Sequence, residues 1–133
     1  MRTRVSADDL FQGLVAGLVV KGWQEICMRD GYADLAFEAA YKKLLQLADT
    51  YDLDVMFRVR RHPIHGDSTV LRDSIFSAAQ DGMVSLENPE YQEVLFKQKP
   101  EEAERLLESL PGGKELFTTL CGEFEKYYDA AAA

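Results

Sequence analysis

The sequence lacks the local signatures by which many enzyme classes are recognised. It has no glycine-rich nucleotide loop, no Rossmann fingerprint, no nucleophile elbow and no cysteine or histidine spacing typical of zinc. Histidine and cysteine are scarce, with two of each among 133 residues. These absences leave an architecture, a charge layout and a ranking of functional classes as what the sequence supports, and they predict no cofactor.

Long apolar runs are also missing. The longest run without a polar side chain, Gly13 to Val20, is far shorter than the ~20 residues of a membrane-spanning helix. Arg2 and Arg4 precede this apolar segment as in a secretory signal, but Asp8 and Asp9 lie where such signals avoid acid. We therefore expect neither a membrane span nor a signal peptide, and a cytoplasmic location.

The two cysteines, Cys27 and Cys121, lie far apart, each within an apolar periodic segment. Such positions are typical of buried, reduced thiols in a cytosolic protein. A disulfide between them is an alternative that the sequence does not support.

Enough apolar material is present for one domain. The chain is 47% hydrophobic and 29% charged, within the ordinary globular range. A chain of this length buries roughly two thirds of the surface that its unfolded form exposes. We predict a single domain over residues 1–129, and we interpret Ala130–Ala133 as a remnant of cloning.

Negative charge dominates and is uneven. The net charge is −8, and basic and acidic residues number six and nine in 1–54, four and three in 55–86, and five and eleven in 87–133. Such a field repels phosphate backbones, which makes nucleic acid an unfavourable partner for the whole domain. It favours a basic protein partner.

Apolar periodicity predicts helices over about 6–28, 32–50, 68–80, 100–110 and 114–128. The first is apolar over so wide an arc that we expect it to be central or to lie in an interface. In the second, Lys42 and Lys43 with Glu38 form a solvated stripe that includes a Glu38–Lys42 pair. In the last, Phe124, Tyr127 and Tyr128 are either core or a recognition patch.

Gly13 and Gly17 lie four residues apart on one side of the first helix. Each costs about 1 kcal/mol relative to alanine in a helix interior, so a close backbone approach is expected to compensate. Two partners are open: another element of the same core, or a second subunit in a homodimer.

A change of period from 3.6 to 2 predicts a strand over Leu53–Val59. Residues 83–86 and 92–96 are predicted to form a hairpin joined by a loop over 87–91. The expected fold is therefore α+β, with about five helices on a small antiparallel sheet of roughly three strands. Because a helix precedes the hairpin, a winged-helix-like arrangement is the alternative.

The predicted strand and its end carry a basic strip, Arg58, Arg60 and Arg61. Two guanidinium groups on one face of a strand could hold a phosphate or carboxylate. Pairing with glutamates of the following hairpin is the alternative use of these side chains.

The loop after this strip holds both histidines, His62 and His65, with Asp67. Imidazole and carboxylate groups are metal ligands and general bases, which makes these three the candidate catalytic residues. Pro63 and Gly66 supply a simpler interpretation, a turn whose end caps the next helix.

Three functional hypotheses follow. The first is a small non-enzymatic interaction or regulatory protein, such as an accessory subunit, an adaptor or an immunity- or antitoxin-like factor, that binds another protein through an acidic surface. The second is a metal-assisted hydrolase or phosphoesterase that uses the histidine loop. The third is a winged-helix nucleic-acid-binding protein that uses Arg60, Arg61 and Arg72.

Overall fold

A computed structural model describes residues 2–28, 31–59, 69–86 and 93–132. Five helices occur in these ranges, which confirms the predicted α+β class. They are α1 (Ala7–Val20), α2 (Tyr32–Leu47), α3 (Thr69–Gln80), α4 (Pro100–Ser109) and α5 (Gly113–Ala132). Four of the five begin and end within a few residues of the predicted bounds.

The described strands form two small sheets. They are β1 (Thr3–Val5), β2 (Glu25–Cys27), β3 (Leu53–Val55), β4 (Val84–Ser85) and β5 (Glu93–Phe96). One sheet is antiparallel with the order β2-β5-β4, and the other pairs β1 with β3 in parallel. The antiparallel sheet of three strands matches the prediction, although it draws its third strand from an unexpected segment.

That segment lies where the first helix was predicted to continue to Met28. The helix instead ends at Val20, because Gly22 adopts the left-handed conformation with φ of 97°. The N–H groups of Gly22 and Trp23 bond back to carbonyls of the last turn, which closes the helix as a Schellman motif. The chain then leaves in a new direction and forms β2, which pairs with β5.

A residue in the left-handed conformation also ends each of the next two helices. Asp52 has φ of 52° after α2, and Gly82 has φ of 76° after α3. In the first case the Leu53 N–H bonds to the Ala48 carbonyl at 2.8 Å. Each of these left-handed residues is followed by a strand within a few positions, so the helix ends set the directions in which the strands start.

The strand predicted over Leu53–Val59 is shorter than expected. Only β3 has strand pairing, and its partner is β1 in the register Thr3↔Leu53 and Val5↔Val55. Beyond it the burial still alternates as far as Val59, which is buried. The two-residue period therefore marks extended backbone, while strand pairing stops earlier.

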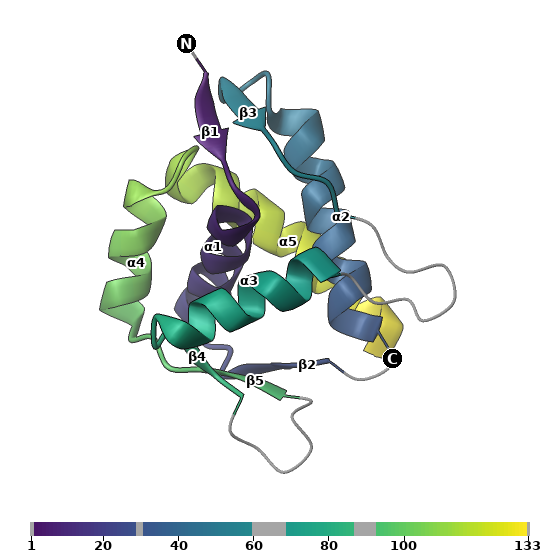
Figure 1. Ribbon diagram of the computed structural model, residues 1–133, viewed down its shortest axis with the longest axis vertical. Coiled ribbons are helices and arrows are strands. Elements are labelled where there is room, and N and C mark those ends of the chain that lie inside the picture. Colours follow the sequence, from purple (N-terminus) through teal and green to yellow (C-terminus); the bar gives the residue numbers. More distant parts are fainter. Residues whose placement is uncertain (1, 29–30, 60–68, 87–92, 133) are drawn as a thin grey trace.

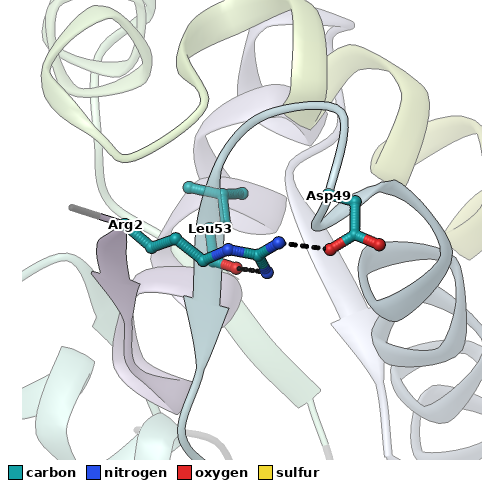
Figure 2. A network of polar contacts seen from close by, with 3 residues as sticks. All are labelled: Arg2, Asp49 and Leu53. Atoms are coloured by element: carbon teal, nitrogen blue, oxygen red, sulfur yellow. Dashed lines mark hydrogen bonds and ion pairs between the residues drawn. The ribbon is translucent and has the colours of Figure 1, made fainter.

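Arg2 ties these two strands to the end of α2 (Figure 2). Its guanidinium group donates to the Leu53 carbonyl at 3.2 Å and to the Asp49 carboxylate at 2.6 Å. The Asp49 hydrogen bond and charge raise the pKa of Arg2. Both side chains face solvent, so this network orients the sheet edge rather than stabilising a buried core.

The hairpin of β4 and β5 is confirmed, with Val84 opposite Phe96. Its predicted loop over 87–91 lies outside the described residues. The order of α3 and then the hairpin, which motivated the winged-helix alternative, is present. However, α2 is followed by β3 rather than directly by α3.

The core is built around α1, which packs against α3, α4 and α5 and lies in the middle of the molecule in Figure 1. From Leu10 to Val19 every residue except Gln12 is buried. Of the two positions expected for the first helix, central or in an interface, the structure shows the central one. On the side away from α4, α2 packs along α5.

Within the described residues, no helix combines the length and apolar character needed to cross a membrane.

Candidate functional site

Most of the predicted site residues cannot be placed. Arg60, Arg61, His62, His65 and Asp67 lie outside the described residues. The metal or catalytic interpretation of the histidine loop and the anion-binding interpretation of the arginine strip therefore stay predictions. In the described part of the chain, no group of three or more His, Cys, Asp or Glu side chains is arranged to hold a metal ion.

Arg58 is the one described residue of the arginine strip. It is exposed, while its neighbours Phe57 and Val59 are half-buried and buried. The Tyr41 hydroxyl donates to the Phe57 carbonyl at 3.0 Å and anchors this segment to α2. The position of Arg58 on the solvent side agrees with the predicted alternation of faces.

Arg72, the α3 residue of the nucleic-acid hypothesis, is already engaged. Its two terminal nitrogens donate to the two carboxylate oxygens of Asp34 at 2.9 and 3.2 Å. Asp34 is fully buried, and a buried carboxylate left without its guanidinium partner is strongly destabilising. Arg72 therefore fastens α3 to α2, and its fork is not free for a phosphate.

The glycine pair of α1 faces α5 of the same chain. A Cβ atom added to Gly13 would overlap the ring of Phe117, and one added to Gly17 would overlap the sulfur of Cys121. The close approach is thus within the core, which was the first of the two alternatives. A homodimer through this helix is not needed to explain the glycines.

The two cysteines are free thiols in different surroundings. Cys27 is half-buried, while Cys121 is fully buried and donates to the Leu14 carbonyl at 3.5 Å. Burial raises the pKa of Cys121 to about 12. Because the thiolate is the nucleophile, Cys121 is structural rather than reactive at neutral pH.

The C-terminal aromatic cluster divides between core and surface. Phe124 is buried and stacks on Tyr128, and Trp23 packs edge-on against Tyr128 with ring centroids 5.5 Å apart. The Cys27 N–H donates to the Tyr128 hydroxyl at 2.9 Å, and burial raises the pKa of Tyr128. Tyr127, by contrast, is 38% exposed. Only Tyr127 is available for contact with a ligand.

Tyr127 borders a groove of about 440 Å³ between α2 and α5. One wall of the groove is formed by α2 residues that recur every three or four positions and so share one side of the helix. The other wall is formed by three residues near the end of α5. Its lining is Leu35, Glu38, Ala39, Lys42, Lys43, Gln46, Glu123, Lys126 and Tyr127. With three lysines against two glutamates, this hollow is locally basic in an acidic protein.

The lysines of the groove differ in their contacts. Lys42 lies 3.6 Å from the Glu38 carboxylate, which confirms the predicted pair. The Lys126 ammonium lies 5.6 Å from the centroid of the Tyr127 ring, within the range of a cation–π contact. Among the described residues, Lys43 makes no ion pair. The groove therefore holds positive charge, on Lys43 and Lys126, that no carboxylate of the described residues neutralises by an ion pair.

The outer face of α4 has the opposite character. It buries Ala103 and Leu107 against the core, and its exposed side carries Glu101, Glu104 and Glu108, with Arg105 among them. Glu104 contacts Lys114 at 3.3 Å, whereas the other two glutamates form no ion pair with any described residue. We call these three glutamates the α4 acidic face.

A smaller hollow of about 240 Å³ adjoins this face, where the end of α3 meets β5 and α4. Asp81, Glu102 and Gln98 line it, together with Lys97 on its rim. The Gln98 side-chain oxygen is buried and has no hydrogen-bond partner among the described residues. The lining of this hollow thus holds two carboxylates, of Asp81 and Glu102, and one ammonium group, of Lys97.

Sequence reasoning identified the Glu38–Lys42 pair but not the groove. The α2 lysines were expected to form only a solvated stripe, because the α5 side chains that complete the groove lie more than seventy positions further along the chain. A helical pattern shows which residues share a face, but it does not show which distant helix borders that face.

Compared with known proteins, the chain matches no family model, no curated sequence and no solved structure.

Proposed function

We propose that this protein is a small non-enzymatic interaction protein that binds a basic surface of another protein through the α4 acidic face. The observation that carries the proposal is the row of Glu101, Glu104 and Glu108 along an exposed helix whose other side is fixed in the core. Because three carboxylates outweigh the one guanidinium group of Arg105, this side of α4 is acidic and suits a basic surface.

The charge layout supports the same proposal. The last third of the chain holds eleven acidic and five basic residues, and α4 lies at the edge of the molecule in Figure 1. Long-range attraction by such a field raises the rate of encounter with a basic partner and weakens as salt is added. We infer action in the cytoplasm, which the two free thiols support.

The other two hypotheses have less in their favour. The hydrolase depends on His62, His65 and Asp67, none of which is among the described residues. The nucleic-acid hypothesis depends in part on Arg72, whose guanidinium group is bound to Asp34. On α3, the exposed side chains include the acidic Asp73 and the apolar Phe76, which is 60% exposed.

The test compares two variants of equal charge in a pull-down from extract of the native cell. The variant E101Q/E104Q/E108Q removes the α4 acidic face, and the control D73N/D129N/E25Q neutralises three exposed acids elsewhere. Partners retained by wild type are identified by mass spectrometry, and their affinity is then measured by calorimetry at low and high salt.

We expect the α4 variant to weaken binding of the partner about tenfold or more, with the control unchanged and the wild-type affinity falling with salt. Equal retention of the partner by the α4 variant would refute this assignment of the surface. Retention of nucleic acid instead of protein would refute the proposed function.

A further inference from the structure

The groove between α2 and α5 differs from the rest of the surface in both shape and charge. It is concave, and its lining carries three lysines and two glutamates in a chain of net charge −8. We propose that this groove binds an acidic, extended peptide segment of a partner protein. This site is separate from the α4 acidic face and calls for a ligand of opposite charge.

Lysine positions support an anionic ligand. Lys43 has no ion-pair partner among the described residues, and Lys126 contacts the Tyr127 ring rather than a carboxylate. Both ammonium groups are therefore available to carboxylates in the groove. Lys42 already shares its charge with Glu38, so it adds less.

The mixed lining favours a peptide over a nucleic acid. Glu38 and Glu123 would repel a continuous row of phosphates, whereas a peptide can place uncharged residues beside them. Leu35, Ala39 and the Tyr127 ring provide apolar surface for alternate side chains. A volume of about 440 Å³ is in the range of small-ligand clefts and takes a few side chains rather than a folded domain.

The groove and the α4 acidic face lie apart. In Figure 1, α4 is at the left of the molecule and α2 at the right, with α1 between them. A ligand seated in the groove would therefore not contact the α4 acidic face. A protein with this arrangement would hold the basic surface of one partner and the acidic segment of another at the same time, on opposite sides of one small core.

Fluorescence anisotropy tests the proposal directly. The probe is a short fluorescein-labelled peptide with the repeat Glu-Leu-Glu-Gly, and its counterpart carries Lys in place of Glu. The variant K43E/K126E reverses two charges in the groove. The control K97E/K99E makes the same change of net charge at exposed positions outside the groove.

We expect wild type and the control to bind the acidic peptide but not its lysine counterpart, and the groove variant to bind it at least about tenfold more weakly. Absence of binding by folded wild type overturns the proposal, as does equal weakening in both variants, which would reflect net charge alone. Displacement of the peptide by inorganic triphosphate at equal concentration would show a general anion site and also overturn the peptide assignment.

Discussion

The two sides of α5 differ in how closely they are packed. Toward α1, glycines allow so close an approach that Phe117 and Cys121 are fully buried. Toward the outer edge of α2, the packing is looser, and a groove lined in part by lysine side chains remains. The first side has no room for one added atom, while the second tolerates changes of charge and shape. If the groove binds a ligand as proposed, stability and binding depend on different faces of α5, and substitutions should separate them.

The largest effect is expected from Gly13→Ala. The new methyl group would overlap the buried ring of Phe117. Overpacking of this kind costs about 3 kcal/mol, offset by about 1 kcal/mol of improved helix propensity. We expect the free energy of unfolding to fall by about 2 kcal/mol, measured by urea denaturation with an unchanged m-value.

Gly122→Ala is the matched control, because Gly122 lies within α5, is exposed and has no atom near its missing Cβ. Only the helix-propensity gain applies, so this variant should be more stable by up to about 1 kcal/mol. If both glycine substitutions changed stability in the same direction, the proposed difference between the two sides of α5 would be wrong.

Gly17→Ala should have a smaller effect, since its methyl group meets the single sulfur atom of Cys121. We expect a loss of about 1 kcal/mol after the gain in helix propensity. In the double variant with Cys121→Ala, the remaining Cβ of residue 121 lies 3.5 Å from the new methyl group, an ordinary contact.

The double-mutant cycle for this pair therefore should show a favourable coupling of about 1 kcal/mol. Strictly additive losses would mean that the sulfur is not what keeps position 17 a glycine. The free energies come from the same urea titrations, with circular dichroism confirming that both single variants fold.

Much of the helical fold could be predicted, because a long apolar stripe is a local signal. The exception is instructive: Trp23 and Ile26 continue the helical spacing, yet Gly22 ends α1 before them. Strand β2 is three residues long and is held by β5, whose Val94 lies opposite Ile26. A strand this short has no pattern of its own, so pairing across the chain decides it.

The candidate surfaces were less accessible to sequence reasoning than the fold. The excess of acid in the last third was visible, but its gathering on one side of α4 depends on which residues the core buries. Arg72 was considered as a phosphate ligand because its partner Asp34, on another helix, could not be paired with it from spacing alone. Tertiary contacts decide whether a charged residue is structural or available.

Tyr128→Phe tests the end of α5, where core and surface meet. Loss of the hydroxyl leaves the Cys27 N–H without its acceptor, at a cost of up to about 1 kcal/mol. Burial also raises the pKa of Tyr128 above the ordinary tyrosine value of 10.0, so the folded state keeps a proton that the unfolded chain releases.

Stability from this source is present below pH 10 and is lost as pH rises through the folded-state pKa. Wild type should therefore lose more free energy of unfolding than Tyr128→Phe between neutral pH and pH values above 10. Comparing the two proteins at each pH cancels the contributions of other tyrosines. Parallel pH profiles would show that Tyr128 is not held in its neutral form by the fold.

The smallest effect on stability is expected from K43E/K126E, the groove variant. Neither lysine forms an ion pair with a described residue, and Lys126 contributes only a solvent-exposed contact with Tyr127. Lys126 is exposed and Lys43 is half-buried, and surface substitutions without ion pairs usually change the free energy of unfolding by less than about 0.5 kcal/mol. A melting temperature close to that of wild type, together with weakened peptide binding, would show that the groove contributes to recognition and not to folding. A clear loss of stability would instead mean that the lysines hold α2 against α5, and the two sides of α5 would then differ less than their geometry indicates.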